Sequence, residues 1–436
     1  MAVDDDTGAR PTERLPLRQL VQISIYWLGI NAIWGGVGIF NQERVDQLAP
    51  PGEAASYLAL MGWLALPVVL LVQPTVGAIS DYTISRWGRR KPYIVIGSVL
   101  DVVFLVGLAT SQTFVALVVF VILLQLSSNF AQGPFQGYVP DLVPPGQVGL
   151  ASALVGAMQT VGFVTGAVLV SVSYRLGDFT LPLILLGVVE LATAAGTFLF
   201  VREGQAAKPR DGRSWVQIGL AAWGLDILRE RSFTFLLVSR LAFLAGVNVF
   251  LSFNVLFLGR SLGMSDDEKA LWVAVIGVVT GLSTAIATIP SGVASNRFGR
   301  KPMIYLACAI GGVGLAVAAL APSPIVLLAG VVLLGVAAGT FLAVDWALMT
   351  DIIPKASSGR FMGISNLAVG LAGPVAALLA GPIIDVVGGP GETGDGPRVA
   401  FLAGIVLFAL GAACLRPVDP TPRERRLGGT AAAIAA

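Results

Sequence analysis

The strongest constraint on this chain is a series of hydrophobic runs, many of them 18 residues or longer, that recur along its whole length. At a rise of about 1.5 Å per residue, such a run forms a helix that crosses a hydrocarbon layer about 30 Å thick. The composition agrees, because 55% of the residues are apolar and 12% are charged, against about 45–50% and about 25% in soluble domains. A water-soluble globule is therefore excluded, and we predict an all-α integral membrane protein.

Hydropathy predicts twelve transmembrane helices. The predicted spans cover residues 20–40, 56–80, 92–110, 113–138, 149–172, 179–201, 233–258, 270–294, 302–321, 324–350, 360–387 and 399–415. The longest polar stretch lies between the sixth and seventh spans and divides the chain into two six-helix halves. The predicted organisation is an N-terminal tail (1–19), a first half (20–201), a connector (202–232), a second half (233–415) and a C-terminal tail (416–436).

The distribution of basic residues predicts the orientation. If the N-terminus is cytoplasmic, the inner segments hold 22 Lys and Arg residues and the outer segments hold 5. Cytoplasmic loops of membrane proteins carry the excess of Lys and Arg, so both termini are predicted to be cytoplasmic. Residues 1–19 are polar and lack the apolar region and cleavage site of a signal peptide. We expect a multi-pass monomer in the lipid bilayer of the cell inner membrane.

Several kinds of chemistry are excluded by residues that the chain lacks. It contains no histidine, and its two cysteines, Cys308 and Cys414, lie within apolar runs. No zinc site, no Ser-His-Asp catalysis and no thiolate chemistry is therefore expected, so we predict neither a metal nor a cofactor. The net charge of +2 gives no basic surface for nucleic acid. A phosphate-binding G-x-x-x-x-G-K-[ST] loop is also missing, so ATP cannot be the energy source.

A polar motif occurs between the second and third spans and again between the eighth and ninth. Residues 77–81 and 86–92 read G-A-I-S-D and R-W-G-R-R-K-P, and residues 292–302 read G-V-A-S-N-R-F-G-R-K-P. Spans four and ten also end alike, at Asp141 and Asp351. Such a duplication within one membrane protein is typical of a secondary transporter whose two halves rock about a central site.

The motif predicts latches at the inner ends of the helices. Gly77 and Gly292 are predicted to allow close backbone approach, and Gly88 and Gly299 to form tight turns. Asp81 is predicted to pair with the arginines of its own loop. Plain topology signalling by the basic residues is the alternative explanation. The candidate gating residues are Gly77, Asp81, Arg86, Gly88, Arg89, Arg90, Asp141, Arg297, Gly299, Arg300 and Asp351.

These residues resemble the major facilitator superfamily over all twelve spans. Residues 71–92, and Gln132-Gly133-Pro134 before Asp141, are similar to the sucrose–proton symporters and the wider glycoside–cation symporters. The resemblance implies a major facilitator fold, in which helices 1, 4, 7 and 10 line a cavity, and proton-linked uptake of a sugar or glycoside. In the family pattern an aspartate associated with proton coupling stands where this chain has Gln125, and an arginine stands where it has Gln136.

A row of amides follows the fourth span at steps of four, three and four residues, which places them on one helix face. Amides facing lipid would leave donors and acceptors unpaired, so this face is predicted to look into protein or a watery cavity. Amides suit a hydroxyl-rich neutral solute because each one both donates and accepts. Hydrogen bonding between helices is the alternative. The candidate solute-binding residues are Asn31, Trp34, Gln125, Asn129, Gln132, Gln136, Asn248 and Trp346, with Asn254 as a weaker one.

Four charged residues fall inside predicted spans at least five residues from either end: Asp101, Glu190, Arg240 and Asp345. A charge at membrane depth costs at least about 2.5–3.5 kcal/mol, so each is a candidate for proton coupling. Arg240 and Asp345 lie at similar predicted depths on helices 7 and 10, and we predict that they form a direct or water-bridged ion pair. For Asp101 and Glu190, on helices that the family fold places at the periphery, a structural role is the alternative.

The sequence therefore predicts a secondary active transporter for a sugar, glycoside or similar polar solute, working by alternating access with a proton as partner. An efflux transporter of amphipathic compounds or lipids is the alternative within the same class. A transporter-like sensor is an alternative from another class, although the connector and tail are too short for a soluble output domain. An enzyme is not expected, because no nucleophile and base converge.

Overall fold

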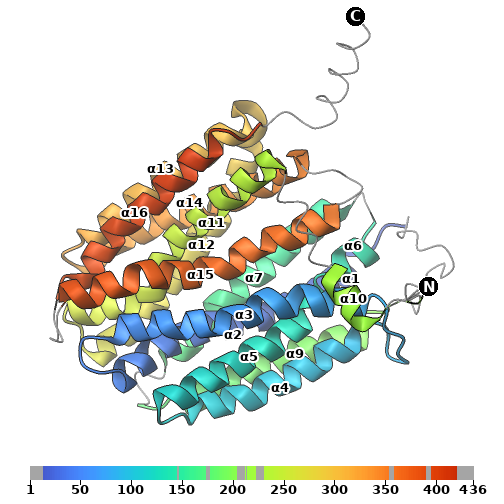
Figure 1. The fold of residues 1–436 in the computed structure, drawn as a ribbon, viewed down its shortest axis with the longest axis horizontal. Coiled ribbons are helices and arrows are strands. Elements are labelled where there is room, and N and C mark those ends of the chain that lie inside the picture. Colours follow the sequence, from blue (N-terminus) through green and yellow to red (C-terminus); the bar gives the residue numbers. More distant parts are fainter. Residues whose placement is uncertain are drawn as a thin grey trace, which may run out of the picture. The chain divides into compact units, whose positions relative to one another are not determined.

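A computed structural model describes residues 13–144, 147–172, 177–203, 212, 214–221, 230–352, 358–388 and 394–419. In these residues helices joined by turns and loops are the only regular secondary structure. Twelve of these helices are long and apolar enough to cross a membrane (Figure 1). The predicted all-α fold with twelve spans is therefore confirmed. Most of the two predicted tails and much of the connector lie outside the described residues.

The chain forms two compact units, which largely follow the two halves of the sequence. The first unit holds residues 1–49, 61–223 and 265–277, and the second holds residues 50–60, 224–264 and 278–436. The helices that lie mainly in the first unit are α1 (Leu17–Ser24), α2 (Tyr26–Leu48), α3 (Ala54–Ser80), α4 (Lys91–Ala109), α5 (Phe114–Phe135), α6 (Tyr138–Leu142), α7 (Val148–Ser171), α9 (Thr180–Phe200) and α10 (Trp215–Ala221). Those mainly in the second are α11 (Arg231–Leu256), the π-helical turn η3 (Phe257–Ser261), α12 (Asp266–Phe298), α13 (Arg300–Ala319), α14 (Pro324–Ile352), α15 (Ser358–Gly388) and α16 (Gly396–Leu415).

Two helix beginnings belong to the unit of the opposite half, and polar contacts explain both. The start of α3 belongs to the second unit, where Asp385 of α15 accepts hydrogen bonds from the backbone N–H groups of Ala55 at 3.3 Å and Ser56 at 2.6 Å. The start of α12 belongs to the first unit, where Lys269 Nζ lies 3.4 Å from Glu43 Oε2. These contacts satisfy amides and charges at helix ends, which hydropathy does not detect.

The first span is longer than the sequence predicted. Residues 17–48 form it, against the expected 20–40. The extension carries Gln42 and Glu43, which are 3% and 9% exposed. Hydropathy stops at such polar residues, but a helix continues wherever its backbone hydrogen bonds continue and its polar side chains find partners.

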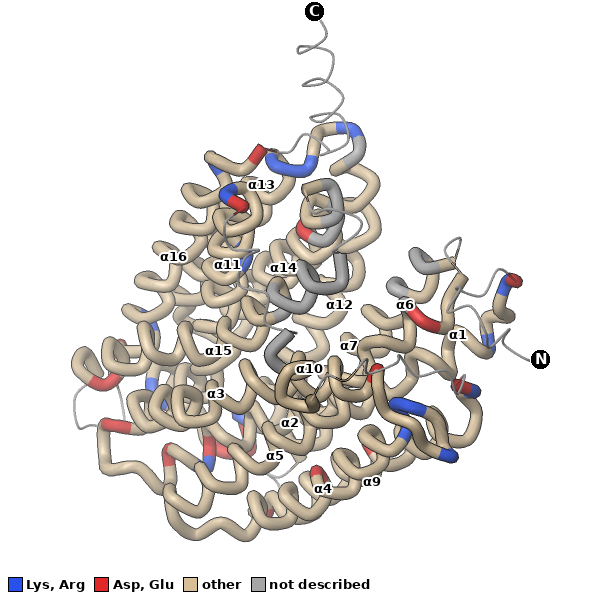
Figure 2. The backbone as a smooth tube through the Cα atoms, turned by 45° about the vertical axis from the view of Figure 1, so that its right-hand side comes forward, with Lys and Arg blue, Asp and Glu red and all other residues tan. Residues whose placement is uncertain are grey.

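Small residues let the helices of the first unit pack closely. A Cβ atom on Gly166 of α7 would lie 1.9 Å from the Ala32 carbonyl oxygen of α2, so only glycine fits there. Many other large apolar side chains are exposed, such as Val115 of the first unit at 72% and Ile289 of the second at 76%. Acidic and basic residues are concentrated toward the helix ends (Figure 2). This division suits helices that pack through small residues and present apolar side chains to lipid.

Candidate functional site

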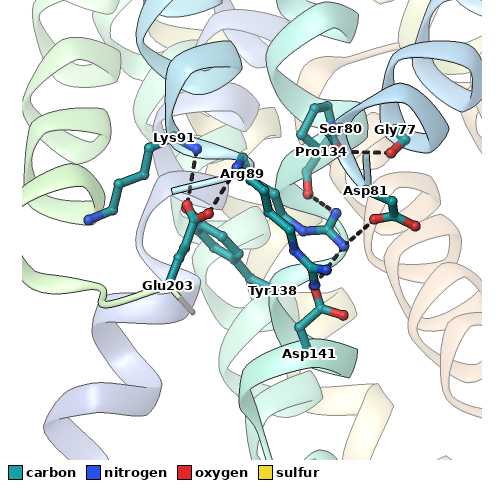
Figure 3. Close-up of polar contacts among 10 residues, drawn as sticks. Gly77, Ser80, Asp81, Arg89, Lys91, Pro134, Tyr138, Asp141 and Glu203 are labelled. Carbon is teal, nitrogen blue, oxygen red and sulfur yellow. Dashed lines mark hydrogen bonds and ion pairs between the residues drawn. The ribbon is translucent and has the colours of Figure 1, made fainter. Parts of the chain in front are cut away.

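The loop between α3 and α4 holds an ion-pair cluster around Arg90, which is 6% exposed. Arg90 Nη2 lies 2.9 Å from Asp81 Oδ1 and 2.6 Å from Asp141 Oδ2. Its Nη1 donates to the Pro134 carbonyl oxygen at 2.6 Å, and Arg89 also pairs with Asp141 (Figure 3). One buried guanidinium therefore ties the end of α3 to α5 and α6 through charge-assisted bonds.

Glycines shape the backbone around this cluster as the sequence predicted. Gly88 has a φ of 112°, a left-handed conformation that glycine adopts without strain, and it forms the predicted turn. A Cβ atom on Gly133 of α5 would lie 2.4 Å from the Gln73 carbonyl oxygen, and one on Gly77 would lie 3.2 Å from the Gly133 carbonyl oxygen. The backbones of α3 and α5 are thus in close contact beside Arg90.

Glu203, just after α9, is a member of this region that the sequence analysis missed. Its Oε2 accepts a hydrogen bond from the Arg90 backbone N–H at 2.8 Å, and its Oε1 accepts one from the Lys91 N–H at 3.0 Å. The Tyr138 hydroxyl donates to the same Oε1 (Figure 3). Glu203 therefore supplies the carboxylate that the free amides at the start of α4 favour. No spacing rule links residue 203 to residues 90 and 91, so only the fold reveals this contact.

Arg86 forms no ion pair with any residue that the structure describes, contrary to the expectation that it would face Asp81. Its side chain is exposed, and the guanidinium carbon lies 5.2 Å from the Trp87 ring centroid. Arg297, the equivalent residue in the second loop, lies in the same way 5.5 Å from the Phe298 ring centroid. Both arginines precede the glycine turn, and their side chains stack on the neighbouring ring.

The second loop repeats the turn but not every contact of the first. Gly299 has a φ of 91°, which confirms the predicted turn before Arg300 at the start of α13. Among the described residues the close approach predicted at Gly292 is not found, since a Cβ atom there would contact Ala343 of α14 at an ordinary 3.8 Å. Lys301 Nζ donates to the carbonyl oxygens of Arg416 and Val418 at 3.0 and 2.7 Å, and so binds the end of α16.

The predicted amide row lies on α5 and at its end. Asn129 is 4% exposed, and its Nδ2 donates to the Gln125 carbonyl oxygen at 2.7 Å and to Gln125 Oε1 at 3.0 Å. Gln132 and Gln136 are half-buried. The row therefore includes an amide pair that its own helix holds in place. The side-chain carbonyl of Asn129 and the side-chain amino group of Gln125 are the groups of this pair that these two bonds do not use.

The other amide candidates are held in a similar way. The Nδ2 atoms of Asn31 on α2 and Asn248 on α11 donate to the carbonyl oxygen four residues earlier, at 2.9 and 2.8 Å, and that of Asn254 donates three residues back at 2.8 Å. Trp34 is partly buried and packs against the core of the first unit. Two candidates have side chains that lie outside the described residues: Trp346 and Asp351.

Arg240 of α11 and Asp345 of α14 form an ion pair inside the second unit. Arg240 Nη1 lies 2.7 Å from Asp345 Oδ2, and the two residues are 2% and 1% exposed. Asp345 Oδ1 accepts no hydrogen bond from the residues that the structure describes. One turn away, Phe243 and Phe341 stack with centroids 3.9 Å apart. The pair is therefore buried one turn from an aromatic stack.

Asp101 of α4 and Glu190 of α9 lie together inside the first unit, and both are 0% exposed. The Tyr26 hydroxyl of α2 donates to Glu190 Oε1 at 3.0 Å and lies 2.7 Å from Ser98 Oγ. Ser127 of α5 donates to Asp101 Oδ1. No pattern in the sequence joins these two acids, because their helices are neighbours only in the fold.

Comparisons with known proteins agree with this architecture. The sequence profile of the Major Facilitator Superfamily matches residues 23–257 and 236–434. The sucrose transport protein SUC3 of Arabidopsis thaliana is 35% identical over 127 residues, a match that spans 24% of this chain and 21% of that protein. The chain thus matches about a fifth of the length of that relative.

Two solved structures share the fold. One is a bacterial homologue of the human lysosomal transporter Spinster in an inward-facing and occupied conformation, with a TM-score of 0.72 at 17% identity. The match covers 93% of this chain and 97% of the homologue's chain. The nucleoside transporter NupG has a TM-score of 0.69 at 14% identity and covers 92% and 98%. The chain belongs to the Major Facilitator Superfamily, and it is a multi-pass membrane transporter and not an enzyme.

Proposed function

We propose that this protein is a secondary active transporter that moves a sugar, glycoside or similar polyhydroxylated solute by alternating access, with a proton as the coupled ion. The observation that carries the proposal is the buried ion pair between Arg240 and Asp345. Two charges at that depth are costly for a membrane protein to keep, and such residues mark ion pathways. The partial similarity to a sucrose transport protein supports a sugar as the solute.

In the proposed mechanism Asp345 takes up and releases the coupled proton. While Arg240 pairs with Asp345, the carboxylate is stabilised in its charged form. When the pair separates, the desolvated carboxylate takes up a proton, because burial without a counter-ion disfavours the charged form. Asp345 Oδ1, which has no donor among the described residues, is the oxygen available to that proton. Re-forming the pair on the other side of the cycle releases it.

The amides of α5 are proposed to bind the solute. Sugar hydroxyls donate and accept, so they can bond to the Asn129 carbonyl and the Gln125 amino group at once. Trp34 and Asn31 of α2 belong to the same proposed contact set, since an indole ring can stack on the apolar face of a sugar. The ion-pair cluster around Arg90 is proposed to act as a latch, away from the solute. We also propose an inner-membrane monomer with both termini cytoplasmic.

A thermal-shift screen of the purified protein against sugars, glycosides, amino acids and amphipathic drugs would identify the solute. A ligand that binds only the folded state raises the stability of the protein. Hits confined to amphipathic compounds would support efflux and contradict a sugar. For the identified solute, Asn129→Leu and Gln132→Leu should each weaken binding by about 1–3 kcal/mol. Unchanged affinity in both variants would assign the amides to helix packing.

Proton coupling is tested by solute-driven proton flux in proteoliposomes. Asp345→Asn should abolish pH-driven accumulation and keep solute exchange, because an amide cannot titrate. Asp178→Asn is the matched control, since hydrogen bonds from the Thr180 backbone and hydroxyl lower the pKa of this exposed carboxyl and keep it charged. Wild-type proton flux in Asp345→Asn would remove this residue from the coupling mechanism.

A further inference from the structure

We propose that Asp101 and Glu190 form a second proton site, a carboxyl–carboxylate pair that holds one proton between them inside the first unit. The site is distinct from the ion pair of Arg240 and Asp345, which lies in the second unit. Its ligand is the proton itself. The inference rests on the contacts of the two acids and does not depend on the identity of the solute.

The two acids lie together inside the first unit, and the described residues supply no counter-ion to either of them. Both are 0% exposed. The Tyr26 hydroxyl that donates to Glu190 also lies 2.7 Å from Ser98 Oγ, one turn before Asp101 on α4, so the two carboxyls occupy the same buried region. Among the residues that the structure describes, no Lys or Arg pairs with either carboxyl. Within this described part of the chain, Tyr26 is the other ionisable neighbour, and its hydroxyl is a donor to Glu190. Two ionised carboxylates placed together in this way would repel each other strongly.

Only one oxygen of each carboxyl accepts a hydrogen bond from a described donor. Asp101 Oδ1 accepts from Ser127, and Glu190 Oε1 accepts from Tyr26. The other two oxygens, Asp101 Oδ2 and Glu190 Oε2, are buried and receive no hydrogen bond from any described donor. Ionised carboxylates only accept, so two neighbouring carboxyls can bond to each other only when one of them carries a proton. One shared proton satisfies the two remaining oxygens at once.

The proposed proton site is built from four helices. Asp101 and Glu190 come from α4 and α9, while their donors Tyr26 and Ser127 come from α2 and α5. Loss of the proton would leave adjacent negative charges among these helices. Because α2 and α5 also carry the proposed solute contacts, occupancy of the proton site would affect their positions. This last consequence rests on the proposed function, whereas the proton site does not.

Infrared spectroscopy tests the site, because a protonated carboxyl has a C=O band separate from that of a carboxylate. The full chain is measured at neutral pH in a maltoside detergent, which has no ester carbonyl. We expect a carboxylic-acid band that shifts on exchange into D₂O and is lost in the double variant Asp101→Asn/Glu190→Gln. Asp178→Asn, which removes an exposed ionised acid, should keep the band.

The outcomes separate this site from the proposed coupling residue. A wild-type spectrum without the band, or a band that persists in the double variant, would overturn the proposal. A band that disappears in Asp345→Asn would assign the proton to the second unit and overturn it as well. Should the double variant fail to fold, the single variants decide, because an unchanged band in either Asp101→Asn or Glu190→Gln contradicts a shared proton. Proton flux in Asp345→Asn tests the proposed function separately.

Thermal unfolding gives a second readout. The folded state holds one proton that the unfolded chain releases at neutral pH, so stability must fall as the pH rises. The chain has no histidine, so no other side chain ordinarily titrates between about pH 5 and 8. The wild-type midpoint should therefore decrease across this range, and the double variant should lose most of the decrease. An equal decrease in both proteins would show that the proton is bound elsewhere.

Discussion

The two units of this transporter treat buried acids in opposite ways. In the second unit Asp345 is balanced by the guanidinium of Arg240 at 2.7 Å. In the first unit Asp101 and Glu190 lie side by side, and their hydrogen-bond donors are the hydroxyls of Ser127 and Tyr26. A cation keeps a buried acid ionised, whereas a second acid requires a proton. The comparison teaches that a duplicated fold can hold its internal charge by two different means.

The largest effect is expected when the cation of the second unit is removed. Arg240→Ala should destabilise the protein by about 3–5 kcal/mol, because it leaves the charge of Asp345 buried without a partner. The thermal midpoint measured by fluorescence-detected size exclusion checks this. The double variant Arg240→Met/Asp345→Leu is the control, and it should recover most of the lost stability. A single variant as stable as the double would mean that Asp345 does not depend on Arg240 for its charge.

The next largest effect is expected in the two helix-connecting loops, where the loss of stability should be greater in the first loop than in the second. Arg90→Ala removes charge-assisted bonds to Asp81, Asp141 and the Pro134 carbonyl oxygen, and should cost about 2–3 kcal/mol because the site is buried. Lys301→Ala removes two bonds to carbonyl oxygens at a more exposed site and should cost about 1 kcal/mol. Thermal midpoints of the two variants decide the order. Equal losses would mean that the two loops contribute alike.

A smaller effect is expected at the hydroxyl that closes the acid pair of the first unit. Tyr26→Phe removes the donor to Glu190 and the partner of Ser98, at a cost of about 1 kcal/mol. The thermal midpoint of the variant, measured beside wild type, checks this. A loss as large as that of Arg240→Ala would contradict the proposed arrangement.

The smallest effect is expected at Arg86. Its exposed side chain stacks on Trp87 and does not enter the ion pairs, so Arg86→Ala should leave the thermal midpoint unchanged within error. Transport should also remain close to wild type, whereas Arg90→Ala should slow it by disrupting the proposed latch. If Arg86→Ala slowed transport as much as Arg90→Ala, Arg86 would have to pair with Asp81 during the cycle.

The sequence by itself determined the all-α fold, the twelve spans and the duplicated loop. Apolar length and composition are properties of the chain, and a lipid environment converts them directly into helices. The glycine turns at Gly88 and Gly299 were also readable, because a left-handed conformation favours one residue type. The pairing of Arg240 with Asp345 was predictable from depth and from the rule that a buried charge needs a partner.

Only the tertiary structure decided which distant residues meet. Glu203 binds the amides of residues 90 and 91, and Asp385 binds those of residues 55 and 56. Such contacts depend on which helices are neighbours, and hydropathy carries no information on that. The pairing of Asp101 with Glu190 is the clearest case. Each acid alone is an isolated charge in an apolar span, and their shared site exists only because α4 packs between α5 and α9.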